Sequence, residues 1–138
     1  VMFFGGGSEA VENALKMVYL YHVARGRPRK HRFIARWRGF HGNTLAADSL
    51  SGHVARREVY TPLLLPVDHI PPAYCYRCWF NKEYPGCDID CARFLERDIK
   101  QEGAECVSAF IAEPMVMTSN IADISYHFVD IDQSVKKE

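Results

Sequence analysis

The sequence predicts an α/β fold built on a mainly parallel sheet. Segments with helical periodicity alternate with short apolar runs in the order helix, strand, helix, strand, helix, strand, which is typical of such folds. The last of these runs, residues 107–112, is predominantly apolar, as expected of a strand buried on both faces. A length of 138 residues with 48% hydrophobic side chains is enough for one globular core.

The first helix is predicted to follow a glycine-rich loop. Residues 5–7 are glycines and precede Ser8, a residue type that caps helix N-termini, and the acidic Glu9 and Glu12 suit the positive end of the helix dipole. Gly26 and Pro28 are expected to end the helix. An apolar stripe repeats at helical spacing over Val11, Ala14, Leu15, Val18 and Tyr21.

A strand and a second helix are expected next. The run Phe33-Ile34-Ala35 has the length of a buried strand and stops at the turn formed by residues 39–42. Thr44 is placed to cap a helix that continues through Leu50 and ends at Gly52. Residues 61–67 hold three consecutive leucines between two prolines, which predicts a short strand there.

A cysteine-rich segment, a third helix and a last strand complete the chain's expected elements. Residues 71–91 contain three prolines and are expected to be irregular. The helix that follows ends before Gly103, and the strand at 107–112 closes with Glu113-Pro114. The helix carries Ile89, Phe94, Leu95 and Ile99 on one face.

The predicted order of elements also locates a binding edge. Ligands of parallel sheets collect at the carboxyl ends of the strands. The loops with residues 5–8 and 40–44 and the strand-end Glu113 are therefore expected to lie there. Backbone N–H groups at a helix start bind anions, so the glycine loop with Ser8 is a candidate anion site, although a plain helix cap without a ligand explains it as well.

The charge is balanced overall but not along the chain. The 17 basic and 17 acidic side chains cancel, so nothing draws the whole protein to nucleic acid or anionic lipid. Seven basic side chains fall within residues 25–38, which we interpret as a solvated turn that biases the local potential toward an anionic ligand. No stretch reaches the roughly 20 apolar residues of a membrane span. The first residues lack a signal-peptide pattern, so we expect a cytoplasmic protein.

Three segments together resemble the class III aminotransferases, which are pyridoxal-phosphate enzymes of fold type I. Residues 6–16 are similar to their phosphate loop and the helix after it, residues 38–45 to their aromatic-His-Gly segment, and residues 110–114 to the strand that closes with Glu-Pro. The three occur in the family's order. The resemblance implies a three-layer α/β/α architecture, with residues 1–116 part of the large cofactor-binding domain, residues 71–91 a cysteine-rich insertion and residues 117–138 a divergent tail.

The resemblance implies cofactor-binding roles for six residues. Phe40 matches the ring that stacks on the pyridine of the cofactor, and His41 completes the turn and orients its neighbours. Glu113 matches a carboxylate near the cofactor or substrate. The residues alone leave open that Phe40 only packs in the core and that Glu113 faces solvent. The loop that holds the cofactor phosphate is matched by Gly6, Gly7 and Ser8.

The activity implied by the resemblance is transamination. An amino group passes from an amine or amino acid to a keto acid or aldehyde, in an enzyme that is usually a homodimer; an aminomutase on the same scaffold is also consistent. The lysine that binds the cofactor covalently and the aspartate that pairs with its pyridine nitrogen have no match in this chain. We therefore expect a partial chain without catalytic residues of its own, which completes no turnover by itself.

Four cysteines form a second candidate site. Their spacing suits a tetrahedral zinc ion or an iron–sulfur cluster, and an irregular segment is one that a metal would order. Small apolar packing of reduced thiols, or an adventitious disulfide, is the alternative. The cluster also leaves open a different class of protein, a small non-enzymatic metal-binding or interaction module. The four are Cys75, Cys78, Cys87 and Cys91.

Overall fold

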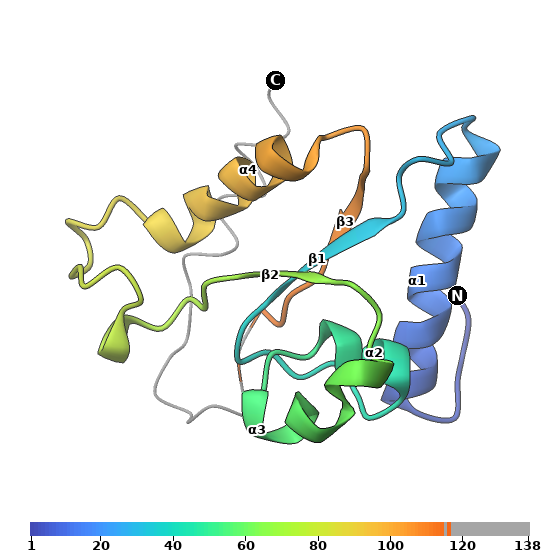
Figure 1. Ribbon diagram of the computed structural model, residues 1–138, viewed down its shortest axis with the longest axis horizontal. Helices are drawn as coiled ribbons and strands as arrows, with labels where there is room; N and C mark the ends of the chain where they lie inside the picture. The colour runs from blue at the N-terminus through green and yellow to red at the C-terminus, as the bar shows by residue number, and fades with distance from the viewer. Residues whose placement is uncertain (115, 117–138) are drawn as a thin grey trace.

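The computed structural model of the protein describes residues 1–114 and 116 (Figure 1). The tail predicted for residues 117–138 lies outside the described residues. Within the described part, no helix is long and apolar enough to cross a membrane. The elements follow in the order α1 (Gly7–Ala24), β1 (Arg32–Arg36), α2 (Leu45–Leu50), α3 (Val54–Arg57), the 3-10 turn η1 (Glu58–Leu63), β2 (Asp68–Ile70), the 3-10 turn η2 (Cys75–Arg77), α4 (Asp90–Glu102) and β3 (Val107–Phe110).

The three strands form one parallel sheet in the order β2-β1-β3. In the central strand β1, Ile34 pairs with Asp68 of β2 on one side and with Phe110 of β3 on the other. Both pairings are parallel, which confirms the predicted sheet. Because all three strands run the same way, the segments that follow them leave the sheet at one edge.

Helix α4 covers one face of this sheet. The buried core consists of Ile34, Ile70 and Val107, one from each strand, and three side chains of the helix pack against it, namely Phe94, Leu95 and Ile99. The apolar face predicted for these helix residues is thus confirmed. Arg32 ties the end of the helix to the sheet, because its guanidinium pairs with both Glu102 and Asp68.

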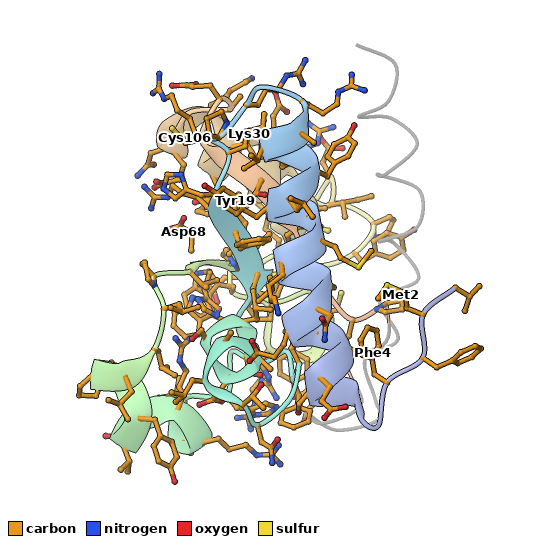
Figure 2. The ribbon with its side chains drawn as sticks, turned by 90° about the vertical axis from the view of Figure 1, so that its right-hand side faces the viewer. Met2, Phe4, Tyr19, Lys30, Asp68 and Cys106 are labelled. Carbon is orange, nitrogen blue, oxygen red and sulfur yellow. The ribbon has the colours of Figure 1, made fainter. Side chains whose placement is uncertain are left out.

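Helix α1 lies on the opposite face, so the molecule has three layers. Side chains alternate along a strand, and Phe33 accordingly points away from the core and lines a groove with Leu15 and Tyr19 of α1. Figure 2 shows Tyr19 directed toward the strands, and Figure 1 shows α1 and α4 on either side of them. The ring of His22 bonds the backbone oxygen of Ser108 at 2.9 Å. This α/β/α arrangement is the one predicted.

The strand predicted within residues 61–67 is wrong. Part of this segment belongs to the turn η1, and Leu63 and Leu65 are 62% and 53% exposed. Pro66 has no N–H to donate to a neighbouring strand, and the N–H of Leu65 donates to the Ser49 hydroxyl instead. The strand forms after the second proline, at Asp68–Ile70, where the backbone can pair with β1.

The predicted role of Ser8 as N-cap of the first helix is also wrong. Helix α1 begins at Gly7, and its N-cap is Gly6, which has an extended backbone and no capping side chain among the described residues. Ser8 lies inside the first turn, where its hydroxyl contacts another loop. The start of α1 therefore consists of small residues, and no described side chain caps its first backbone N–H groups.

Candidate cofactor site

Three loops that are far apart in the sequence meet at the carboxyl edge of the sheet. Ser8, at the start of α1, contacts Asn43 in the loop after β1. Phe40, in that same loop, contacts Glu113 after β3. The structure thus brings together the three segments that the sequence analysis placed at this edge.

Ser8 and Asn43 are joined by two hydrogen bonds. The Ser8 hydroxyl donates to Asn43 Oδ1 at 3.0 Å and accepts from the Asn43 N–H at 3.1 Å. Gly42 makes this approach possible, because a Cβ there would lie 2.5 Å from Ser8 Oγ and 2.9 Å from the Ala47 Cβ. Its φ of +133° is also one that favours glycine.

A carboxylate of α1 fixes the start of α2 beside this contact. Glu12 Oε1 accepts a hydrogen bond from the Thr44 hydroxyl at 2.6 Å and from the N–H of Ala46 at 3.2 Å. Thr44 is the N-cap of α2 by position, as predicted, but it caps through Glu12 rather than through its own side chain. The two helix starts are therefore held side by side.

The start of α1 has the chemistry of an anion site. The first N–H groups of a helix have no acceptor within it, and no described side chain caps those of α1. Gly6 and Gly7 have open space where a Cβ would stand. Together with the helix dipole, these N–H groups favour a phosphate or another anion.

Phe40 is positioned by the strand end rather than by the core. Its N–H donates to Glu113 Oε1 at 2.5 Å, and its ring is only partly buried. The Arg56 guanidinium lies 5.1 Å from the centre of the ring. Simple core packing of Phe40 and a purely solvent-facing Glu113, the two alternatives left by the sequence, therefore do not describe these side chains.

His41 is held with its ring partly buried in the same turn. The backbone N–H of His41 donates to the Ser51 hydroxyl at 2.9 Å, and the ring Nε2 is buried without a hydrogen-bond partner among the described residues. Burial lowers the pKa of the imidazole, against an opposing effect of Glu113. The ring is therefore biased toward its neutral form.

Positive charge gathers around this turn. Arg38 has a φ of +71°, and its guanidinium stacks 3.9 Å from the ring centre of Tyr74. The pKa of His53 is lowered by burial first and then by the nearby Arg56, while Glu113 raises it. Such a field favours an anionic ligand at this edge.

Sequence reasoning missed three residues of the site. Asn43 lies within the segment 38–45 that carried the resemblance, and its position after Gly42 was the available signal. Glu12 was assigned only to the helix dipole, and nothing in its spacing pointed to Thr44. Ser51 gave no signal, because its role depends on how the turn at residues 39–42 folds back over α2.

The four cysteines of the second candidate site line one small cavity of about 20 Å³. None of them forms a disulfide bond; Cys75 is exposed and the other three are partly buried. Burial raises the pKa of the Cys91 thiol. Among the described residues, no group of three or more His, Cys, Asp or Glu side chains is already arranged to hold a metal ion.

The first site fits the pyridoxal phosphate that the sequence resemblance implies. The uncapped start of α1 supplies donors for a phosphate, and nothing stands within 4 Å of the position that a Cβ would take at Gly6 or Gly7. The buried Nε2 of His41 is a polar atom that still lacks a partner in the described structure. Gly6, Gly7, Ser8 and Phe40 thus offer the donors and the ring that this cofactor requires, and the backbone of Phe40 is held by Glu113.

Comparisons with curated proteins agree with this arrangement. The family model described as aminotransferase class III matches residues 1–125. Adenosylmethionine-8-amino-7-oxononanoate aminotransferase of Geobacter sulfurreducens is 37% identical over 117 residues, which cover 84% of this chain and 26% of that protein. Putrescine–pyruvate aminotransferase of Pseudomonas aeruginosa is 38% identical over 115 residues, which cover 83% and 25%. The chain thus spans about a quarter of the length of the curated relatives it matches.

Solved structures show the same fold. The omega transaminase of Pseudomonas jessenii in complex with PMP superposes with a TM-score of 0.83 at 32% sequence identity. The superposition covers 96% of this chain and 29% of that one. Since the family model matches nearly all of the described residues and the fold agrees with that of a solved transaminase, the chain belongs to the class III aminotransferase family.

Proposed function

We propose that this chain supplies the phosphate cradle and the stacking ring of a pyridoxal-phosphate-dependent aminotransferase. The reaction moves an amino group from an amine or amino acid to a keto acid or aldehyde. The observation that carries the proposal is the uncapped start of α1 held against the Gly42–Asn43 turn by Ser8. The names of the relatives, aminotransferases for an amine and a keto acid among them, favour this function over a non-enzymatic module.

Each part of the site has one task in this function. The N–H groups and the hydroxyl at the start of α1 bind the phosphate and fix one end of the cofactor. The ring of Phe40 packs on the pyridine plane, and Glu113 keeps that ring in place through the Phe40 N–H. Pyridoxal phosphate, when bound, would supply the aldehyde carbon that takes up and passes on the amino group, and the ring that withdraws electrons from it.

We propose that the covalent bond to the cofactor is formed by a residue other than those that the structure describes. Neither the lysine nor the aspartate that the resemblance calls for is matched in this sequence, so binding and orientation are the tasks left to these residues. His41, biased toward its neutral form by burial, has an Nε2 that can make one further hydrogen bond.

A homodimer in the cytoplasm is the assembly and location that we propose for the whole enzyme. Several apolar side chains of α1 face away from the sheet, with Met17, Leu20 and Tyr21 exposed by 52%, 65% and 57%. Apolar surface of this kind is usually covered by further protein. Figure 2 shows Met2 and Phe4 beside the same helix, and both are exposed as well.

The phosphate cradle is tested with pyridoxamine phosphate and its phosphate-free counterpart, pyridoxamine. Neither carries an aldehyde, so neither reacts with surface lysines. Calorimetric titration of the whole chain is expected to show binding of the phosphate ester at least about tenfold tighter than that of pyridoxamine, because helix N–H groups contact the phosphate. Inorganic phosphate should compete with the ester.

Substitutions at the start and the middle of α1 give a matched pair. Ser8→Asp places a carboxylate at the phosphate position and is expected to remove the advantage of the ester, while the helix tolerates the charge near its N-terminus. Ala14→Asp adds the same charge on an exposed part of the same helix and should leave binding unchanged. Equal affinity for ester and pyridoxamine, or an ester affinity that Ser8→Asp leaves intact, contradicts the proposal.

A further inference from the structure

The cysteine-rich segment brings four thiols to one cavity from separate stretches of backbone. Cys75 begins the turn η2, Cys78 follows it, Cys87 lies in the loop beyond, and Cys91 stands in the first turn of α4. All four line the same small cavity. Chance packing of four small apolar side chains does not explain this set, because Cys75 is exposed rather than buried.

The size of the cavity limits what it can hold. A volume of about 20 Å³ accommodates roughly one water-sized body. A single ion fits such a space, whereas an iron–sulfur cluster, with several iron and sulfide atoms, is larger. The thiols therefore point to one metal ion.

The two ends of the segment are fixed to the sheet by one side chain. Arg36 of β1 is 4% exposed; it donates to the backbone oxygen of Pro71 at 2.8 Å and to that of Cys91 at 3.2 Å. Between these anchors, Lys82 and Asp90 pair at 2.5 Å beside the cavity. The thiols thus lie on a short segment whose two ends are held to the sheet.

The segment has little of its own to hold it together. Besides the three-residue turn η2, residues 71–89 contain no helix or strand, and Tyr76, Trp79 and Tyr84 are 76%, 60% and 52% exposed. The ring of Phe80 makes a tilted contact with that of Phe94, which packs against the core. Segments without a core of their own are commonly ordered by a bound metal.

We propose that Cys75, Cys78, Cys87 and Cys91 bind one zinc ion as a closed structural site. Zinc prefers four thiolates in a tetrahedron, and it needs no open position when its role is structural. In the present arrangement no three of these side chains are set to hold a metal. Binding therefore draws the four sulfurs inward around the cavity and releases their thiol protons to solvent. The ion orders the segment between β2 and α4, and the proposal is independent of the cofactor site.

Metal analysis of the whole chain, purified without a histidine tag, is the direct test. We expect about one zinc per chain, and the visible spectrum of tetrahedral thiolate coordination when Co²⁺ replaces it. Cys78→Ser and Cys87→Ser should each abolish the Co²⁺ spectrum. Cys106→Ser is the matched control, because Cys106 lies before β3 and outside the cavity, and it should retain both the metal and the spectrum.

Three results overturn the proposal. The first is a metal content below about a tenth of an equivalent, with no Co²⁺ spectrum after the thiols have been reduced. The second is stoichiometric iron with sulfide, which indicates a cluster. The third is a Co²⁺ spectrum that survives both serine substitutions. Mass spectrometry of the unreduced chain separates the first result into free thiols and a disulfide, either of which counts against a zinc site.

Discussion

The cofactor site and the cysteine segment are assembled in opposite ways. The hydrogen bonds of the cofactor site join residues 35 and 73 positions apart, Ser8 to Asn43 and Phe40 to Glu113. The four cysteines fall within seventeen residues of one another, yet no three of them are arranged for a metal. Closeness along the chain thus does not by itself arrange side chains for binding.

The elements that carry the side chains explain this difference. The loops of the cofactor site begin at strand ends or at a helix start, and those elements fix where each loop leaves the sheet. Most of the cysteines stand in turns whose backbone has no partner strand or helix. The first site is therefore held in place by the fold, whereas we expect the second to be completed by what it binds.

Arg36 fixes the cysteine segment to the sheet, and its removal should have the largest effect. Arg36→Met keeps an apolar stem but leaves the buried backbone oxygens of Pro71 and Cys91 without their donor. We expect a loss of about 3 kcal/mol in the free energy of unfolding, measured by urea denaturation, and weaker Co²⁺ binding by the cysteines.

Arg36→Lys serves as the control, because it keeps the charge and one donor. Its free energy of unfolding should fall by less than that of the methionine variant, and it should bind Co²⁺ more tightly than that variant does. Burial already lowers the pKa of Arg36 to about 10, so the guanidinium stays charged at neutral pH. If Arg36→Met unfolds like the unsubstituted chain, this side chain does not hold the cysteine segment to the sheet.

Most elements could be predicted because their signals are local. The extent of helix α1, the apolar run of β1 and the face of α4 each follow from a local pattern, and the order of these elements places three loops at one edge. The apolar stripe predicted for α1 is only partly right, because Ala14 and Tyr21 are exposed. Strand β2 could not be predicted, because Asp68, His69 and Ile70 contain no apolar run and form a strand only by pairing with β1. The leucines at residues 63–65 do form an apolar run, but they have no partner strand, so the strand predicted there was wrong.

The contacts within the site were less predictable than its location. A serine before a helix usually caps it, but Ser8 bonds Asn43, 35 residues away. That choice depends on Gly42, whose lack of a side chain lets the loop approach α1. The order of elements thus predicts where the loops lie, but the hydrogen bonds between them depend on the folded backbone.

Gly42→Ala should have the next largest effect, through the close approach of the loop to α1. The added Cβ would meet Ser8 Oγ at 2.5 Å, and the φ of +133° is strained for alanine. We expect a loss of about 2 to 3 kcal/mol in the free energy of unfolding, together with weaker binding of pyridoxamine phosphate.

The same substitution in the cysteine segment is the control for Gly42. A Cβ at Gly86 would find its nearest neighbour at 3.6 Å, which is an ordinary contact. Gly86→Ala should therefore change the free energy of unfolding by less than about 0.5 kcal/mol. A loss of similar size in both variants argues that the two regions do not differ in rigidity.

The smallest expected effect is a dependence of stability on pH that comes from His41. Burial lowers its pKa in the folded protein, so the unfolded chain binds more protons once the pH falls below the ordinary histidine value of about 6.5. Stability is then complete above that pH and is lost progressively toward and below the lowered pKa. Urea denaturation between pH 7.5 and 5.5 should show a decrease in the free energy of unfolding that is smaller than the decrease caused by Gly42→Ala.

Two variants test whether His41 is the source of this pH dependence. His41→Gln should flatten the slope of stability against pH. Ser51→Ala removes the partner of the His41 backbone N–H but keeps the imidazole, so it should lower stability at every pH and retain the slope. An unchanged slope in His41→Gln assigns the pH dependence elsewhere; His53 and His69 are then the next residues to substitute, because burial lowers their pKa values too.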